Sequence, residues 1–134
     1  MDKNNYLIDL SESDRTDFGR VDFAAQSYEQ QVFSAIWALE SRVNNGGFVE
    51  FFDNEDPLIV SFAVSALRAV GANNCAEIVG RAVALASSRE PGQAAEELDS
   101  LDSEFYEYPD NLTELLYQYV AANQATFGKL SGGA

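Results

Sequence analysis

The chain has no histidine and a single cysteine among its 134 residues. Without histidine it cannot form a Ser-His-Asp or Cys-His catalytic group, an H-E-x-x-H zinc site or an imidazole proton shuttle. The one thiol, Cys75, cannot close an intramolecular disulfide, so folding does not require an oxidising compartment. We therefore expect Cys75 to be a small residue of the core.

Basic residues are also scarce. The chain has 8 Lys and Arg against 22 Asp and Glu, which gives a formal net charge of −14. Affinity for a phosphate backbone comes largely from Lys and Arg, so direct binding of nucleic acid is not expected. An anionic membrane would repel the chain for the same reason. The charge instead favours encounters with cations or with basic protein surfaces.

The sequence contains no long apolar run and no export signal. Its longest strongly apolar stretch, residues 57–67, includes serines and is shorter than the ~20 residues that cross a bilayer. Residues 1–5 have neither the basic region nor the apolar region of a signal peptide. We expect a cytoplasmic protein.

The apolar residues of the chain recur with the period of an α-helix. Apolar residues make up 46% of the sequence, enough to form a core despite the net charge. Residues 1–25 show no clear period and predict an irregular arm with one short helix near 17–25. From position 28 apolar residues recur every three or four positions, which predicts an amphipathic helix that ends at the N-N-G-G sequence of residues 44–47. A short helix over 48–54 is expected to follow.

The second half of the chain predicts further helices. Asp56-Pro57 is typical of a helix start, and residues 57–70 are apolar around most of the helical wheel, as in a central helix. More helices are expected over residues 75–86, 96–108 and 112–127, with Asn73 or Asn74 as the cap of the first and Asn111 as the cap of the last. Asn123 is expected to hydrogen-bond a buried backbone group. No segment alternates with period two, as a half-buried strand would. The predicted fold class is all-α: a compact bundle of about six helices around a buried central helix over 57–70, in one domain over 26–128, with a frayed tail over 129–134.

Carboxylates are concentrated in two segments that contain no Lys or Arg. One runs from Glu90 to Glu114, and the other is the turn before residues 57–70. Side chains three or four residues apart on a helix lie ~5–6 Å apart, and duplex DNA carries one charge per ~3.4 Å of axis on each strand, so such rows can approximate phosphate charge. The candidate partner-binding residues are Glu96, Glu97, Asp99, Asp102, Glu104, Glu107, Asp110, Glu50, Asp53, Glu55 and Asp56.

Other interpretations of these carboxylates stay open at this point. A charged helix face commonly serves solubility alone. An interaction or immunity-type module would instead bind its partner through the apolar segment 48–52. Paired carboxylates can also bind Mg or Ca or hydrolyse glycosides, but these side chains are expected to point outward, and no D-x-D-x-D-G loop is present. We therefore assign no catalytic residue, no metal ligand and no cofactor, and we expect no enzymatic activity.

Four ordered motifs resemble those of a small bacterial family of helical proteins, mostly uncharacterised, that includes an acidic DNA-mimic protein. The most specific is the N-N-G-G-F-x-x-F-F signature at residues 44–52. The others lie at residues 66–72, 98–106 and 119–127, so the resemblance spans about 28–127. The family often has Gln at the position of Glu50, where this chain adds a charge.

This resemblance implies an all-α fold without known catalysis. For the DNA-mimic member it implies a homodimer whose acidic surface occupies the DNA site of a transcription factor. Together with the charge distribution, it leads to the hypothesis of a DNA mimic that occupies the DNA-binding surface of a basic protein such as a transcription factor.

Overall fold

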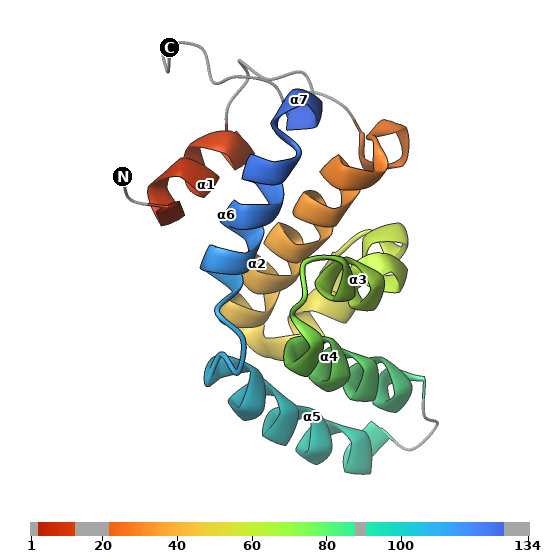
Figure 1. Cartoon of the computed structure of the whole chain (residues 1–134). Coiled ribbons are helices and arrows are strands. Elements are labelled where there is room, and N and C mark those ends of the chain that lie inside the picture. The colour runs from red at the N-terminus through yellow and green to blue at the C-terminus, as the bar shows by residue number, and fades with distance from the viewer. Residues whose placement is uncertain (1–2, 13–21, 88–90, 128–134) are drawn as a thin grey trace.

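The computed structural model describes residues 3–12, 22–87 and 91–127. Within these residues it contains seven α-helices, one 3₁₀ turn and no strand, so the all-α class is confirmed. In chain order the elements are α1 (Lys3–Glu12), η2 (Phe23–Ala25), α2 (Tyr28–Asn54), α3 (Pro57–Ala69), α4 (Asn73–Ala86), α5 (Pro91–Tyr106), α6 (Leu112–Ala122) and α7 (Gln124–Phe127). Figure 1 shows α2 in the middle of the molecule, with α1 and α6 on one side, α3 and α4 on the other, and α5 at one end.

A glycine pair divides α2 into two helical segments. Gly46 and Gly47 have non-helical backbone angles, and Gly47 has φ +78° and ψ −174°, a combination almost restricted to glycine. The helix end predicted at residues 44–47 is therefore confirmed. The change of direction buries Phe48 and Phe51, which follow the glycines, in the core.

The centre of the fold is α2 and not the predicted helix over residues 57–70. The 27 residues of α2 let it contact α3, α5, α7 and η2. Helix α3 packs against α2 and α4, and its first apolar residue, Leu58, is 53% exposed. The side chains that α3 buries are Ile59, Ala63, Ala66 and Leu67. This helix therefore forms one wall of the core.

Side-chain caps begin two of the helices as predicted. Asp56 accepts a hydrogen bond from the Leu58 N–H at the start of α3, and Asn111 accepts one from the Glu114 N–H at the start of α6. Helix α4 begins differently, because its N-cap residue, Ala72, has no side chain that can accept a hydrogen bond. The sequence suggested a cap at 73–74, which is wrong.

The expected irregular arm is wrong for residues 3–12, which form α1. Leu7 and Leu10 are buried in the core, and α1 packs against α6. A helix of 10 residues offers too few repeats for its period to be recognised in a polar segment. The first residues of the short helix expected near 17–25 lie outside the described part of the chain, and its end forms η2.

The last predicted helix is interrupted at Asn123, which separates α6 from α7. The Asn123 amide donates a hydrogen bond to the Tyr119 carbonyl at 2.8 Å, in agreement with the expectation that it binds a backbone group. Phe127 of α7 is buried. The expected frayed tail over 129–134 lies outside the described residues.

The core includes Cys75, as predicted. Its side chain is fully buried, and burial raises the pKa of the thiol to about 12. Over residues 3–12, 22–87 and 91–127, no helix is both long enough and apolar enough to span a membrane.

Candidate functional site

Helix α5 has one apolar face and one acidic face. Its buried face consists of Leu98, Leu101 and Phe105, which pack toward α4 and α2. The exposed carboxylates of this segment are Glu96, Glu97, Asp99, Glu104 and Glu107. The periodicity of the sequence placed these side chains correctly, because residues on one helix face recur every three or four positions.

The acidic face has a charge density close to that of a DNA strand. With 1.5 Å of rise per residue, the six candidate carboxylates from Glu96 to Glu107 extend over about 16 Å, or about one per 3 Å. One strand of duplex DNA carries a charge every ~3.4 Å of axis. The contacts of each side chain decide how many of the six can reach a partner.

Asp102 makes a structural contact that the sequence analysis did not predict. Its Oδ1 accepts a hydrogen bond from the Phe48 N–H at 2.8 Å, directly after the glycine kink of α2. Burial raises the pKa of Asp102, whereas the bond from Phe48 lowers it. A Cβ added at Gly47 would stand 2.9 Å from the Asp102 Cγ, so a glycine is needed for this close approach. Asp102 therefore fixes α5 against the N-N-G-G turn.

Glu104 is partly neutralised by a residue of another helix. Arg81 of α4 lies 2.9 Å from its carboxylate, although the sequence around Glu104 contains no cation. Both side chains are about half exposed, so water screens the pair and its energetic contribution is small. The pair borders a groove of about 480 Å³ between α4 and α5, whose lining includes Leu85, Leu101 and Glu97.

Asp110 has a structural role that the sequence analysis did not predict. Its Oδ2 accepts a hydrogen bond from the Cys75 N–H at 2.8 Å, and its Oδ1 accepts one from the Asn74 side chain at 3.1 Å. Asp110 thus supplies from a distant loop the cap that the start of α4 lacks locally. Sequence reasoning missed this role because the two segments are 35 residues apart.

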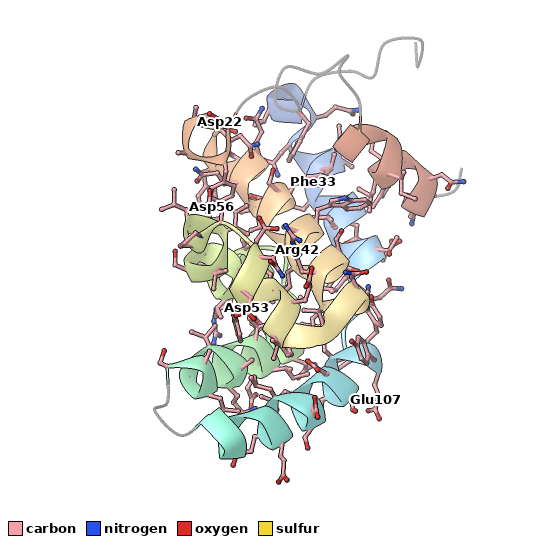
Figure 2. The ribbon with its side chains drawn as sticks, turned by 180° about the vertical axis from the view of Figure 1, so that it is seen from behind. Asp22, Phe33, Arg42, Asp53, Asp56 and Glu107 are labelled. Carbon is pink, nitrogen blue, oxygen red and sulfur yellow. The ribbon has the colours of Figure 1, made fainter. Side chains whose placement is uncertain are left out.

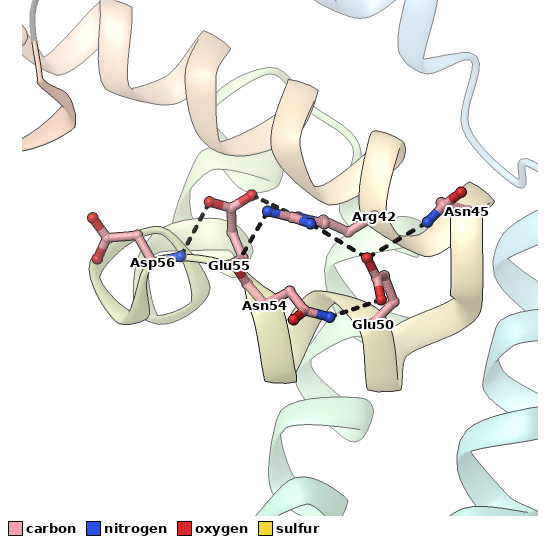
Figure 3. A network of polar contacts seen from close by, with 6 residues as sticks. All are labelled: Arg42, Asn45, Glu50, Asn54, Glu55 and Asp56. Carbon is pink, nitrogen blue, oxygen red and sulfur yellow. Dashed lines mark hydrogen bonds and ion pairs between the residues drawn. The ribbon is translucent and has the colours of Figure 1, made fainter.

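In the acidic turn before α3, Glu50 and Glu55 are bound to Arg42 (Figure 3). The guanidinium lies 3.3 Å from the Glu50 carboxylate and 3.2 Å from that of Glu55. Glu50 also accepts a hydrogen bond from the Asn54 amide at 2.7 Å. Both carboxylates are therefore engaged by Arg42 within the protein, and their contact with a partner stays a prediction.

The two remaining carboxylates of the turn are exposed. Asp56 caps α3 through one oxygen, and Asp53 has no hydrogen bond or ion pair among the described residues. Figure 2 shows Asp22, Asp56 and Asp53 following one another down one side of the molecule, whereas Glu107 lies at the end of α5. Asp22 extends this row, and the sequence analysis missed it because it lies outside both acidic segments.

The candidate carboxylates therefore separate into three groups. We call the first the α5 row; its members are Glu96, Glu97, Asp99 and Glu107. The second group, engaged by the protein itself, consists of Asp102, Glu104, Asp110, Glu50 and Glu55. Asp53 and Asp56 form a smaller exposed pair at the turn. The α5 row is the largest run of carboxylates that the described residues leave open.

A family model described as DMP19-like protein matches residues 24–123. The chain belongs to the DMP19-like family. The match contains α2 to α6 in full and all of the candidate carboxylates, so the site lies in the part that defines the family. No curated protein and no solved structure matches the chain.

The apolar segment 48–52 of this DMP19-like chain is mostly part of the core. Phe48 and Phe51 are fully buried and Phe52 is partly buried, whereas Val49 is 49% exposed, so a partner contact through this segment would have to use Val49 and the edge of Phe52. The exposed large apolar side chains include Tyr28 and Leu58, at the start of α2 and of α3.

Glu40 is a titratable residue that the sequence analysis did not single out. Its Oε2 accepts a hydrogen bond from the Tyr108 hydroxyl at 3.2 Å. Burial raises the pKa of Glu40 to about 7, although the Tyr108 bond lowers it. The sequence contained a signal, because position 40 lies on the same helix face as Ile36 and Val43, both of which are buried. A carboxylate on an apolar face is a candidate functional group.

The part of the chain that the structure describes contains no group of three or more Asp, Glu or Cys side chains placed to hold a metal ion.

Proposed function

We propose that this DMP19-like chain is a non-enzymatic DNA mimic that occupies the DNA-binding surface of a basic protein such as a transcription factor. The observation that carries the proposal is the α5 row. Its four exposed carboxylates span about 16 Å along α5 and the residue that follows it, a segment with no Lys or Arg between positions 91 and 107. This is about one open charge per 4 Å, close to the ~3.4 Å of one DNA strand.

The distribution of cations supports the same role. Of the described basic residues, Lys3, Arg42 and Arg81 are engaged in ion pairs with Glu114, with the turn and with Glu104. None of them lies in a pair with the α5 row. Like charges on one helix face repel one another and lower the stability of the helix. Lys or Arg residues interspersed with the carboxylates would avoid this repulsion. Binding to a basic surface offers a reason for a row without them.

The rigidity of the site favours binding. Leu98, Leu101 and Phe105 hold α5 on the core, and Asp102 fixes it to the turn after Gly47. The carboxylates are therefore already in position before a partner arrives, which lowers the entropic cost of association. The groove beside Glu97 would accept the aliphatic part of an Arg or Lys side chain whose charge lies on the Glu97 carboxylate, whereas Glu104 at the same groove is already paired with Arg81.

The family resemblance supports further parts of the proposal. We expect the protein to act in the cytoplasm, where its basic partner binds DNA, and to form a homodimer as the DNA-mimic member of the family does. The exposed pair Asp53 and Asp56, with Asp22, would supply a second acidic surface to such an assembly.

Affinity capture from the native cell at low and at high salt tests the proposal. The tagged chain should recover a basic DNA-binding protein at 50 mM NaCl and lose it at high salt, since exposed charges are screened beyond ~10 Å already at 0.1 M. Added duplex DNA should compete with the chain for the partner. A partner that duplex DNA does not displace would refute mimicry.

A pair of charge-matched variants identifies the surface. The first carries Glu96→Gln, Glu97→Gln and Glu107→Gln on the α5 row, and it should weaken partner binding severalfold and reduce the salt dependence. The control carries Glu29→Gln and Glu77→Gln with Glu114→Gln, three carboxylates outside both exposed acidic surfaces, and should bind nearly as the unmodified chain does. Equal loss in both variants would mean that net charge, and not this row, determines binding. Retained binding in both would favour a module that uses its apolar surface.

A further inference from the structure

A second candidate site is a cavity on the α1 side of α2, whose lining contains no residue of the α5 row. The cavity has a volume of about 210 Å³. It is formed by two residues of α1, four of α2 and one of α6: Leu7, Ile8, Trp37, Glu40, Ser41, Asn44 and Thr113. A water molecule takes ~30 Å³ of liquid volume, so the cavity has room for several waters or for a short organic group.

Glu40 is the only ionisable side chain that lines the cavity, as far as the described residues show. One of its oxygens, Oε2, accepts the hydrogen bond from Tyr108. The other oxygen, Oε1, has no partner among the described residues. No fully buried side-chain oxygen or nitrogen of these residues lacks a hydrogen bond, so the unpaired Oε1 is not fully buried, and Glu40 is one of the residues that line the cavity. A carboxylate that has no cation beside it faces this space.

The rest of the lining offers apolar surface and polar groups that can accept hydrogen bonds, since a hydroxyl oxygen accepts as well as donates. The hydroxyls of Ser41 and Thr113 have no hydrogen bond within residues 3–12, 22–87 and 91–127, and the Asn44 amide nitrogen is engaged with Tyr108, which leaves the Asn44 carbonyl oxygen free. An ammonium group has three N–H donors and no acceptor, so it matches a set of oxygens around one carboxylate.

The apolar walls select for a carbon chain on that ammonium. Leu7, Ile8 and the ring of Trp37 offer contact to methylene groups, and an indole ring also attracts a cation. Trp37 is held in place by stacking on Phe33, with ring centroids 5.6 Å apart. A hydrated metal ion would gain nothing from these walls, whereas an alkylammonium uses both parts of the lining.

We propose that this cavity binds a primary alkylammonium group, from either a free amine or the lysine side chain of a protein partner. The inference rests on the cavity and Glu40, and it does not depend on DNA mimicry.

Binding should increase with pH between 6 and 8. The ammonium pairs with the ionised form of Glu40, whose pKa of about 7 places its ionisation in this interval. The other titratable groups that interact with Glu40 are Tyr108, after α5, and Cys75 of α4, and burial raises the pKa of both, so they stay neutral. The residues of α1 and α6 that line the cavity do not titrate.

Titration with n-butylammonium chloride, followed by NMR of the full chain, tests the proposal. The Trp37 indole N–H and the Asn44 side-chain amide should shift, and 1-butanol or NaCl at equal concentration should shift neither. Glu40→Gln should weaken binding at least about tenfold at pH 8, because a charge-assisted bond is lost. The control Glu29→Gln, which removes one charge from the same helix outside the cavity, should bind as the unmodified chain does.

The remaining outcomes are also decisive. Equal affinity in Glu40→Gln, equal shifts with 1-butanol, or shifts confined to the α5 row would overturn the proposal. If Glu40→Gln does not fold, two other measurements test the site: the pH dependence of butylammonium binding to the unmodified chain, and butylammonium binding to Thr113→Val. If binding does not depend on pH and Thr113→Val does not weaken it, the site is refuted. Nα-acetyl-lysine-N-methylamide distinguishes the two sources of the ammonium group. If it binds as tightly as butylammonium, the ligand is a lysine side chain; if only butylammonium binds, the ligand is a free amine.

Discussion

Replacing Gly47 by alanine tests how α5 is attached to the rest of the molecule. Gly47 has φ +78° and ψ −174°, which alanine does not readily adopt. Its new Cβ would also stand 2.9 Å from the Asp102 Cγ. The carboxylate would have to move, and it would then lose the 2.8 Å hydrogen bond from the Phe48 N–H. A single methyl group therefore disturbs both the backbone and the anchor of α5.

The two costs can be estimated separately. A non-glycine residue held in this region of backbone angles costs about 1–3 kcal/mol. Leaving a partly buried N–H without its acceptor costs about 1–3 kcal/mol more. We therefore expect Gly47→Ala to lower the free energy of unfolding by roughly 2–6 kcal/mol, against a total of about 5–15 kcal/mol for an ordinary domain.

Urea unfolding, followed by Trp37 fluorescence and by circular dichroism, measures this loss. Two other glycines serve as controls. Gly71 has φ +86° but nothing within 4 Å of an added Cβ, so Gly71→Ala reports the backbone cost alone, about 1–2 kcal/mol. Gly80 lies inside α4 with free space around it, so Gly80→Ala should be neutral or stabilising by up to about 1 kcal/mol.

The order of the three variants decides the question. If Gly47→Ala lowers the free energy of unfolding no more than Gly71→Ala does, the contact with Asp102 contributes nothing and the reasoning is refuted. Asp102→Ala removes this contact in advance, so in an Asp102→Ala background Gly47→Ala should cost less stability than it does alone. If it costs the same, the reasoning is also refuted.

Two further predictions concern buried and paired charges. Arg42→Met should lower the melting temperature because Glu50 and Glu55 then repel each other without their shared cation, and the loss should shrink in 0.5 M NaCl, as a salt series of thermal scans would show. Glu40 should make the chain less stable as pH rises from about 4.5 to about 7, because its pKa is raised in the folded state and only the unfolded chain ionises in that interval. The loss should be roughly 2–4 kcal/mol, and Glu40→Gln should remove it; equal pH profiles of unfolding for both proteins would contradict the assignment.

Local patterns in the sequence were sufficient to predict most of the fold. The N-N-G-G turn, the Asp56-Pro57 start and the Asn111 cap are signals carried by a few adjacent residues, and each lies where it was predicted. Helix α1 was missed because Leu7 and Leu10 belong to a segment too short and polar to show a period.

The exposed side of α5 was also predictable, because helical periodicity separates Leu98, Leu101 and Phe105 from the acidic positions. What each carboxylate contacts was not predictable. Arg81 reaches Glu104 from 23 residues away, and Asp102 reaches Phe48 across 54 residues. A scan for neighbouring cations along the sequence cannot detect such contacts, since they depend on how the helices pack.

The division of the carboxylates into open and engaged groups makes a final prediction, one that requires no partner. Glu96→Gln and Glu107→Gln should each raise the melting temperature slightly at low salt, because each removes repulsion from the α5 row, and the gain should vanish in 0.5 M NaCl. Asp102→Ala and Asp110→Ala should each lower stability by about 1–3 kcal/mol at any salt concentration, because a backbone N–H loses its acceptor. If substitutions in the α5 row destabilise the chain as the anchors do, these carboxylates have structural partners, and the surface on which the proposed function rests is not free to bind.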